Sequence, residues 1–269
     1  MIVTLVVAAS LASQSPPART AGQSILQDAS EAIRGGRLEE AKLLIARATS
    51  AGIGGPALER VMANLAFASG KYDEAANLYK HLVNSSAKQA GDCEKGAISA
   101  LEVGRLADAK PLADCAVSAG NPSWRAWDTR GVLADLMHDW PLADECYSRA
   151  RQLAPKQARV INNQGWSKLL RGDWAAAVPL LERAAALDNK SGRIANNLQL
   201  ANAALAADLP QRYGGESDRH WAVRLNDAGV AAELLGQKAR AVAAFTQALQ
   251  ASPVWYERAS NNLKMLSER

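Results

Sequence analysis

The chain has 269 residues, of which 48% are apolar and 22% charged, and its formal net charge is +4. The apolar fraction excludes a disordered chain, and nineteen glycines with ten prolines exclude a collagen-like one. Abundant Ala with only two Phe is typical of closely packed helices, and the small positive excess, without a dense Lys/Arg block, does not indicate nucleic acid binding.

The chain starts with an apolar run, Ile2 to Ala12, that ends in small residues. A membrane span needs about twenty such residues, so none is predicted here. The run has the length of a signal-peptide apolar region, although only Met1 stands before it where a basic leader is usual. We expect residues 1–12 to be a signal peptide, residues 13–21 a linker, and the mature protein to be periplasmic or secreted. The alternative is a cytoplasmic protein that keeps this apolar start.

The rest of the chain repeats with a period of 34 residues, in units that start at residues 22, 56, 90, 124 and 158. The eighth place of each unit holds a small residue: Ala29, Ala63, Ala97, Gly131 and Gly165. The fifteenth place holds Gly36, Gly70, Gly104, His138 and Gly172. Small residues let two antiparallel helices approach closely, and glycine permits the turn between them. Since one such pair cannot bury its own apolar face, neighbouring pairs must stack.

This pattern resembles the tetratricopeptide repeat (TPR) family, and the resemblance is clearest in residues 158–191 and 222–255. It covers nearly all of the chain after the apolar start. The resemblance implies an all-α fold, a right-handed superhelical TPR solenoid of antiparallel helix pairs with a C-terminal capping helix. The array is expected over residues 22–207.

The unit that starts at residue 192 departs from the pattern, because its second helix is replaced by Asp208–Pro210 and Tyr213–Glu216. We expect an interrupting loop over residues 208–216. Ser217 has the character of an N-cap for a longer helix, so the final TPR unit is predicted over residues 217–255. A capping helix is predicted over residues 256–269. At His138, which stands where a turn glycine is usual, we expect a tolerated substitution.

The sequence gives little support for catalysis. His81, His138 and His220 are far apart, and no zinc-binding spacing, phosphate-binding loop or nucleophile elbow occurs. We therefore predict that the protein is not an enzyme and that it needs no metal and no cofactor.

Three cysteines occur, at positions 93, 115 and 146. In a helix pair that turns near Gly104, Cys93 and Cys115 would lie roughly opposite one another, so a disulfide between them is conceivable in an exported protein. The alternative is that all three are small buried apolar side chains.

The TPR resemblance also implies a concave groove, lined by the first helices of the pairs, that holds a peptide or a partner helix. Places two, five, six and nine of each unit face this groove in the family. The groove residues predicted on that basis are Arg125, Asp128, Arg159, Asn162, Asn163, Trp166, Arg193, Asn196, Asn197, Asn226, Asp227 and Asn261.

Two rows stand out within this set. Asn163, Asn197 and Asn261 share the sixth place, and an amide can pair with both groups of an extended peptide backbone; alternatively, these residues only steady the helix starts. Arg125, Arg159 and Arg193 are one repeat apart and would suit carboxylates, or else are solvated on the helix starts. Trp166 is a candidate apolar anchor in the groove, or packs against the next helix.

These patterns predict a non-catalytic scaffold that binds an extended segment of a protein or peptide partner, with neither nucleic acid nor a membrane span involved. Exported TPR proteins of this type resemble accessory proteins of pilus, secretion and envelope assembly. A carbohydrate-binding module for an envelope polymer and a cytosolic TPR adaptor are the two alternatives. The partner and the oligomeric state do not follow from the sequence.

Overall fold

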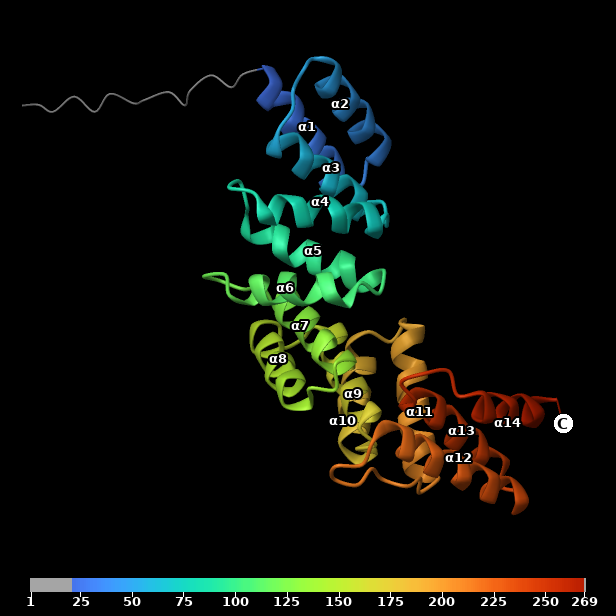
Figure 1. Ribbon diagram of the computed structural model, residues 1–269. Coiled ribbons are helices and arrows are strands. Elements are labelled where there is room, and N and C mark those ends of the chain that lie inside the picture. Colours follow the sequence, from blue (N-terminus) through green and yellow to red (C-terminus); the bar gives the residue numbers. More distant parts are fainter. Residues whose placement is uncertain (1–20, 269) are drawn as a thin grey trace, which may run out of the picture. The chain divides into compact units, whose positions relative to one another are not determined.

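The computed structural model of the chain describes residues 21–268 (Figure 1). Over this range the chain forms fourteen α-helices and no strand, which confirms the predicted all-helical fold class. The predicted signal peptide (residues 1–12) and all but the last residue of the predicted linker lie outside the described residues. None of the helices described is both long and apolar enough to cross a bilayer.

The chain divides into two units, one up to Ser99 and one from Ala100. The first unit contains α1 (Ala21–Arg34), α2 (Leu38–Ser50), α3 (Pro56–Ala68), α4 (Tyr72–Asn84) and most of α5 (Ala90–Glu102). Within it α1 packs against α2 and α3 against α4. Alanines at the helix crossings, among them Ala29, Ala48 and Ala63, are completely buried, which permits this close packing.

The second unit contains the remaining nine helices. These are α6 (Leu106–Val117), α7 (Trp124–Leu136), α8 (Trp140–Leu153), α9 (Ala158–Leu170), α10 (Trp174–Leu187), α11 (Gly192–Ala206), α12 (Asp218–Leu234), α13 (Lys238–Ala251) and α14 (Glu257–Ser267). The pairs α7–α8, α9–α10 and α12–α13 make the most extensive helix contacts of this unit. From Pro56 to Gly192, the first helices start at the residues that begin the 34-residue units.

The small residue at the eighth place is required by the side chain that it faces. A Cβ atom at Gly131 would lie 2.7 Å from the Tyr147 ring, and one at Gly165 would lie 2.8 Å from Leu181. At Gly229 the distance to the Phe245 ring would be 2.5 Å. Real Cβ atoms do not approach other atoms so closely, so the bulky residue on the second helix excludes any side chain at these three glycines.

The turns between the paired helices need a left-handed backbone. Gly36, Gly70, Gly104, Gly172 and Gly236 have φ values from 71° to 74°. His138 occupies the same place with φ 59°, a conformation that costs a residue with a Cβ more than it costs glycine. His138 nevertheless adopts the left-handed conformation of the turn. Its ring Nδ1 lies 2.8 Å from Oδ2 of Asp218 at the start of α12.

No second helix follows α11; residues 207–217 are irregular, one residue longer at each end than the predicted loop. Ser217 is the N-cap of α12 and accepts a hydrogen bond from the His220 backbone N–H at 3.3 Å. Trp221 of α12 is buried and stacks on Trp174 of α10, with ring centroids 6.2 Å apart. The interruption therefore brings α12 against the α9–α10 pair, and Trp221 becomes part of their core.

Candidate functional site

A cavity of about 400 Å³ lies among the first helices of the second unit, and we call it the central groove. Its apolar lining comes from Val132, Leu136, Trp166 and Leu170, and its polar lining is Glu102, Asp135, Tyr147, Arg159, Asn162, Asn163, Arg193 and Asn197. Most of these residues lie on α7, α9 and α11, whose spacing of one repeat places equivalent side chains beside one another.

Six of the predicted groove residues line this cavity: Arg159, Asn162, Asn163, Trp166, Arg193 and Asn197. The other six do not. Asp128 is 0% exposed beneath it, Asn196 points to solvent, and Arg125 lies over the neighbouring Trp124 ring at 4.3 Å. Asn226, Asp227 and Asn261 belong to α12 and α14, outside this cavity.

The buried carboxylate of Asp128 is held by two side chains of the next first helix. Arg159 Nε donates to its Oδ2 at 3.0 Å, and Asn163 Nδ2 donates to its Oδ1 at 3.0 Å. Burial raises the pKa of the Asp128 carboxyl, while the charge of Arg159 and both hydrogen bonds act to lower it. A buried carboxylate needs such partners, so Arg159 and Asn163 stabilise the contact between α7 and α9.

The asparagine row continues this bonding from repeat to repeat. Asn197 Nδ2 donates to Oδ1 of the buried Asn162 at 2.9 Å, and Asn162 Nδ2 donates to Oδ1 of Asn163 at 3.3 Å. At the end of the array, Asn262 Nδ2 donates to Oδ1 of the buried Asn226 at 3.0 Å, whereas Asn261 is exposed. Asn163 and Asn197, both at the sixth place, thus bond the fifth place of the preceding first helix, and Asn262, one place later in its unit, bonds the fifth place of α12. These bonds hold the first helices in register.

The arginine row is not uniform. Arg125 stacks on Trp124, and Arg159 is engaged with Asp128 while its side chain stays 48% exposed. Arg193 is exposed, lines the groove and has no carboxylate partner among residues 21–268. Arg193 is therefore the cation of this row that is available to a ligand.

Asp135 at the end of α7 is a groove residue that the sequence analysis missed. It accepts hydrogen bonds from Tyr147 Oη at 2.8 Å and from Ser167 Oγ at 2.6 Å, and it is only 6% exposed. Burial raises the pKa of Asp135 to about 6, against the lowering effect of these hydrogen bonds and of the nearby Arg171 charge. A signal was present, because Asp135 follows Asp128 by seven residues and so lies on the same helix face.

Trp166 is half-buried, and it both packs against the core that contains Trp174 and Trp221 and lines the groove. It also borders a second cavity of about 370 Å³, which we call the adjoining cavity. Asp135, Leu136, Trp166 and Leu170 line both cavities. The adjoining cavity is completed by the α7–α8 turn with His138 and by the start of α12 with Asp218, to which Arg212 is also paired.

Outside the groove, Cys93 and Cys115 are disulfide-bonded, and Cys146 is a buried free thiol. Burial raises the pKa of the Cys146 thiol to about 12. Within the described part of the chain, no three His, Cys, Asp or Glu side chains gather as a metal site would require.

No protein-family model matches the sequence, and no curated protein is detectably similar to it. Solved structures are similar. The structure titled PilW, a type IV pilus biogenesis factor, is 17% identical with a TM-score of 0.54, over 91% of this chain and 100% of that one. A tetratricopeptide repeat protein from Parabacteroides merdae is 15% identical with a TM-score of 0.55, over 91% and 98% of the two chains.

A third structure, pilF of Pseudomonas aeruginosa, is 14% identical with a TM-score of 0.53, over 92% of this chain and 97% of that one. At these identities the likeness concerns the fold and not the activity. This similarity in fold agrees with three features of the chain: helix pairs that repeat every 34 residues, small residues at the helix crossings, and left-handed turns within the pairs. The chain therefore has the tetratricopeptide-repeat fold.

Proposed function

We propose that the protein is a non-catalytic scaffold that binds an extended segment of a partner protein in the central groove. The observation that carries this proposal is the composition of that cavity. It places the unpaired Arg193 beside the half-buried amide of Asn197 and the apolar side chains of Leu136, Trp166 and Leu170. A concave site that combines apolar side chains with polar groups able to bond a ligand is typical of a ligand site.

The lining also indicates how a segment would bind. Asn197 uses Nδ2 to bond Asn162, while its Oδ1 has no partner among residues 21–268 and can accept a backbone N–H. Arg193 can bind a carboxylate through two parallel hydrogen bonds. An apolar side chain of the segment would contact Leu136 and Trp166, since large aromatic residues in concave sites contribute much of the binding energy.

We further propose that the protein is exported and acts in envelope, pilus or secretion assembly. The apolar run Ile2 to Ala12 supports export. The role in assembly rests on analogy with the pilus proteins of similar fold, one of which is titled a type IV pilus biogenesis factor.

The test is photo-crosslinking in the native cell envelope. A photoreactive amino acid is placed at Leu136, which lines the groove and is 52% exposed, or at Leu153 on α8, which is 53% exposed and lies outside it. We expect one or a few proteins to crosslink at Leu136 and not at Leu153. Adding Arg193→Gln should abolish this crosslink without changing the helical content, because Arg193 is exposed.

The same proteins at both positions, or crosslinks unaffected by Arg193→Gln, would overturn the assignment of the groove. Binding to purified cell-wall polymer that Arg193→Gln reduces, with no protein crosslinked at Leu136, would instead support a carbohydrate-binding module.

A further inference from the structure

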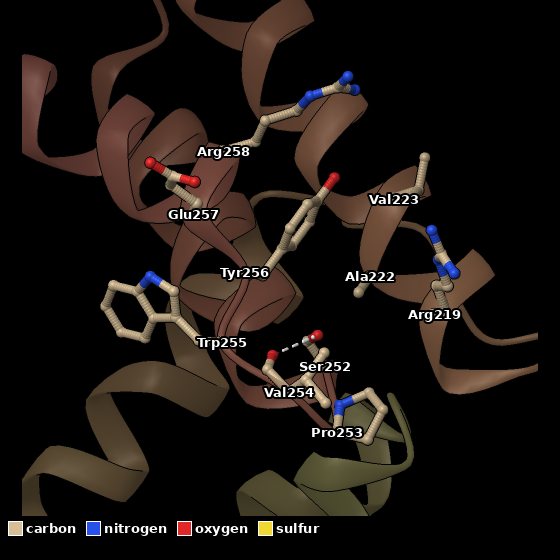
Figure 2. A pocket seen from close by; sticks show the side chains of 10 residues that line it. All are labelled: Arg219, Ala222, Val223, Ser252, Pro253, Val254, Trp255, Tyr256, Glu257 and Arg258. Carbon is tan, nitrogen blue, oxygen red and sulfur yellow. Dashed lines mark hydrogen bonds between the residues drawn. The ribbon is translucent and has the colours of Figure 1, made fainter.

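A third hollow lies at the C-terminal end of the second unit, and we call it the C-terminal pocket (Figure 2). Its volume is about 510 Å³. It is lined by Arg219, Ala222 and Val223 of α12, by the linker from Ser252 to Tyr256, and by Glu257 and Arg258 of α14. None of these residues lines the central groove.

The linker that forms one wall is unlike its counterparts in the preceding repeats. The α8–α9 linker reads Ala-Pro-Lys-Gln over residues 154–157, and the α10–α11 linker reads Asp-Asn-Lys-Ser over residues 188–191. The α13–α14 linker reads Ser-Pro-Val-Trp-Tyr over residues 252–256. Val254 is 73% exposed and Trp255 is 76% exposed, so packing of the repeat does not account for the apolar residues here.

Two features restrict the conformation of this linker. Pro253 restricts the backbone, and Ser252 Oγ donates a hydrogen bond to the carbonyl oxygen of Val254 at 2.7 Å, drawn as a dashed line in Figure 2. The side chain of Tyr256 points between Val223 and Arg258 in the same view. A wall restricted in this way loses less conformational entropy when a ligand binds, which favours affinity.

The charges at the rim indicate the chemistry of the ligand. Neither Arg219 nor Arg258 is paired with a carboxylate among the residues that the structure describes. Arg224, also on α12, differs in this respect, because its guanidinium is bound to Glu216 at 2.8 Å. Figure 2 shows Glu257 directed away from Arg219, on the other side of Tyr256. The two free guanidinium groups therefore favour an anionic ligand.

We propose that the C-terminal pocket is a second binding site, which takes a short acidic segment of a partner polypeptide with an apolar residue beside the acid. The carboxylate of the segment binds Arg219 and Arg258. Its apolar side chain packs against Val223, Val254 and Tyr256, and its backbone lies along the linker. A hollow, rather than a protruding apolar surface, favours such a segment over a lipid bilayer.

The experiment uses the full chain labelled with ¹⁵N and follows the indole N–H signal of Trp255, assigned with Trp255→Phe. The probe is a pool of capped hexapeptides with Asp or Glu at positions two and four and with Leu, Ile, Val, Phe, Tyr or Trp at positions three and five. The matched pool has Asn or Gln in place of the acids. We expect the acidic pool to shift the Trp255 signal to saturation and to bind about tenfold or more tightly than the amide pool.

Arg219→Gln/Arg258→Gln should weaken binding of the acidic pool by about tenfold or more. Arg149→Gln/Lys156→Gln removes two exposed positive charges outside the pocket and should leave binding unchanged. Arg193→Gln, in the central groove, should also leave it unchanged, so the two sites can fail independently.

The proposal is overturned if both pools shift Trp255 equally or not at all, or if Arg219→Gln/Arg258→Gln has no effect. It is also overturned if phosphatidylglycerol vesicles change the Trp255 indole signal while the acidic pool does not, since the pocket would then face a membrane. Self-association through this surface is tested by sedimentation. If wild type is a dimer and Trp255→Phe is a monomer, the surface is an interface between two copies of the chain, which would also contradict a site for a separate partner.

Discussion

Asn163 Nδ2 donates a hydrogen bond to Oδ1 of Asp128 at 3.0 Å, and so joins α9 to a carboxylate that is 0% exposed on α7. Arg159 bonds the same carboxylate. Arg159 and Asn163 were expected to contact a ligand, but these bonds show that they stabilise the array. Variants that probe binding should therefore alter Arg193 or Leu136, which are exposed in the groove.

Asn163→Ala should lower the free energy of unfolding by about 1–3 kcal/mol, because it leaves the buried carboxylate of Asp128 with fewer hydrogen-bond partners. Urea denaturation followed by circular dichroism measures this. Asn196→Ala, at an exposed amide on α11, should change the same quantity by less than about 0.5 kcal/mol. Equal stability of the two variants would show that the Asp128 network contributes nothing.

Asp135 should make stability depend on pH in an identifiable direction. Its pKa in the folded protein is raised from 3.8 to about 6, so the folded state binds the proton more tightly than the unfolded state. This contribution to stability is fully present below about pH 4 and is lost as the pH rises through about 6.

Asp135→Asn removes this titration. We therefore expect the unfolding free energy of wild type, relative to Asp135→Asn, to rise by about 1–3 kcal/mol between pH 7 and pH 4. Paired urea titrations at both pH values measure the difference, and the other titrating groups cancel between the two proteins. A difference that stays constant with pH would mean that Asp135 titrates as it does in the unfolded chain.

Gly229→Ala should destabilise the α12–α13 pair, because its Cβ would lie 2.5 Å from the fully buried Phe245 ring. We expect a net loss of about 1–2 kcal/mol, since overpacking outweighs the gain in helix propensity. Gly214→Ala is the control, because its Cβ would meet nothing within 4 Å. Adding Phe245→Leu to Gly229→Ala should recover part of the loss; no recovery would point to a cause other than the ring contact.

His138→Gly should be more stable than His138→Ala by about 1 kcal/mol, because φ at this position is 59° and glycine adopts such values at no steric cost. Both variants lose the contact with Asp218, so the comparison isolates the backbone. Thermal or urea unfolding of the two proteins measures it. If Ala matched Gly, the turn would have to relax away from the left-handed conformation.

Thiol titration should separate the three cysteines. Cys93 and Cys115 are disulfide-bonded, and burial raises the pKa of the Cys146 thiol to about 12. The native protein should therefore react very slowly with a disulfide reagent, the unfolded but unreduced protein should show one thiol, and the reduced protein three. Three thiols without reduction would mean that no disulfide forms.

The helix pairs and the residues at which their units start could be predicted from the sequence alone. Small residues at the eighth place and glycines at the fifteenth act within one pair, over short separations along the chain, so their spacing predicts a local structure. The missing helix after α11 and the N-cap at Ser217 could be predicted for the same reason, because both depend on neighbouring residues.

The roles of the groove residues, in contrast, depend on how the repeats pack against one another. Asp128, Arg159 and Asn163 looked like three ligand contacts, yet they bond one another across repeats, at separations of 31 and 35 residues. Asp135 and the arginines of the C-terminal pocket carry no motif. The character of Asp135 comes from burial and from its hydrogen bonds to Tyr147 and Ser167, and that of Arg219 and Arg258 from the path of a linker and the lack of a carboxylate partner among the described residues. Such properties depend on which elements meet in space, because desolvation and pairing are set by the surroundings of a side chain and not by its position in the repeat.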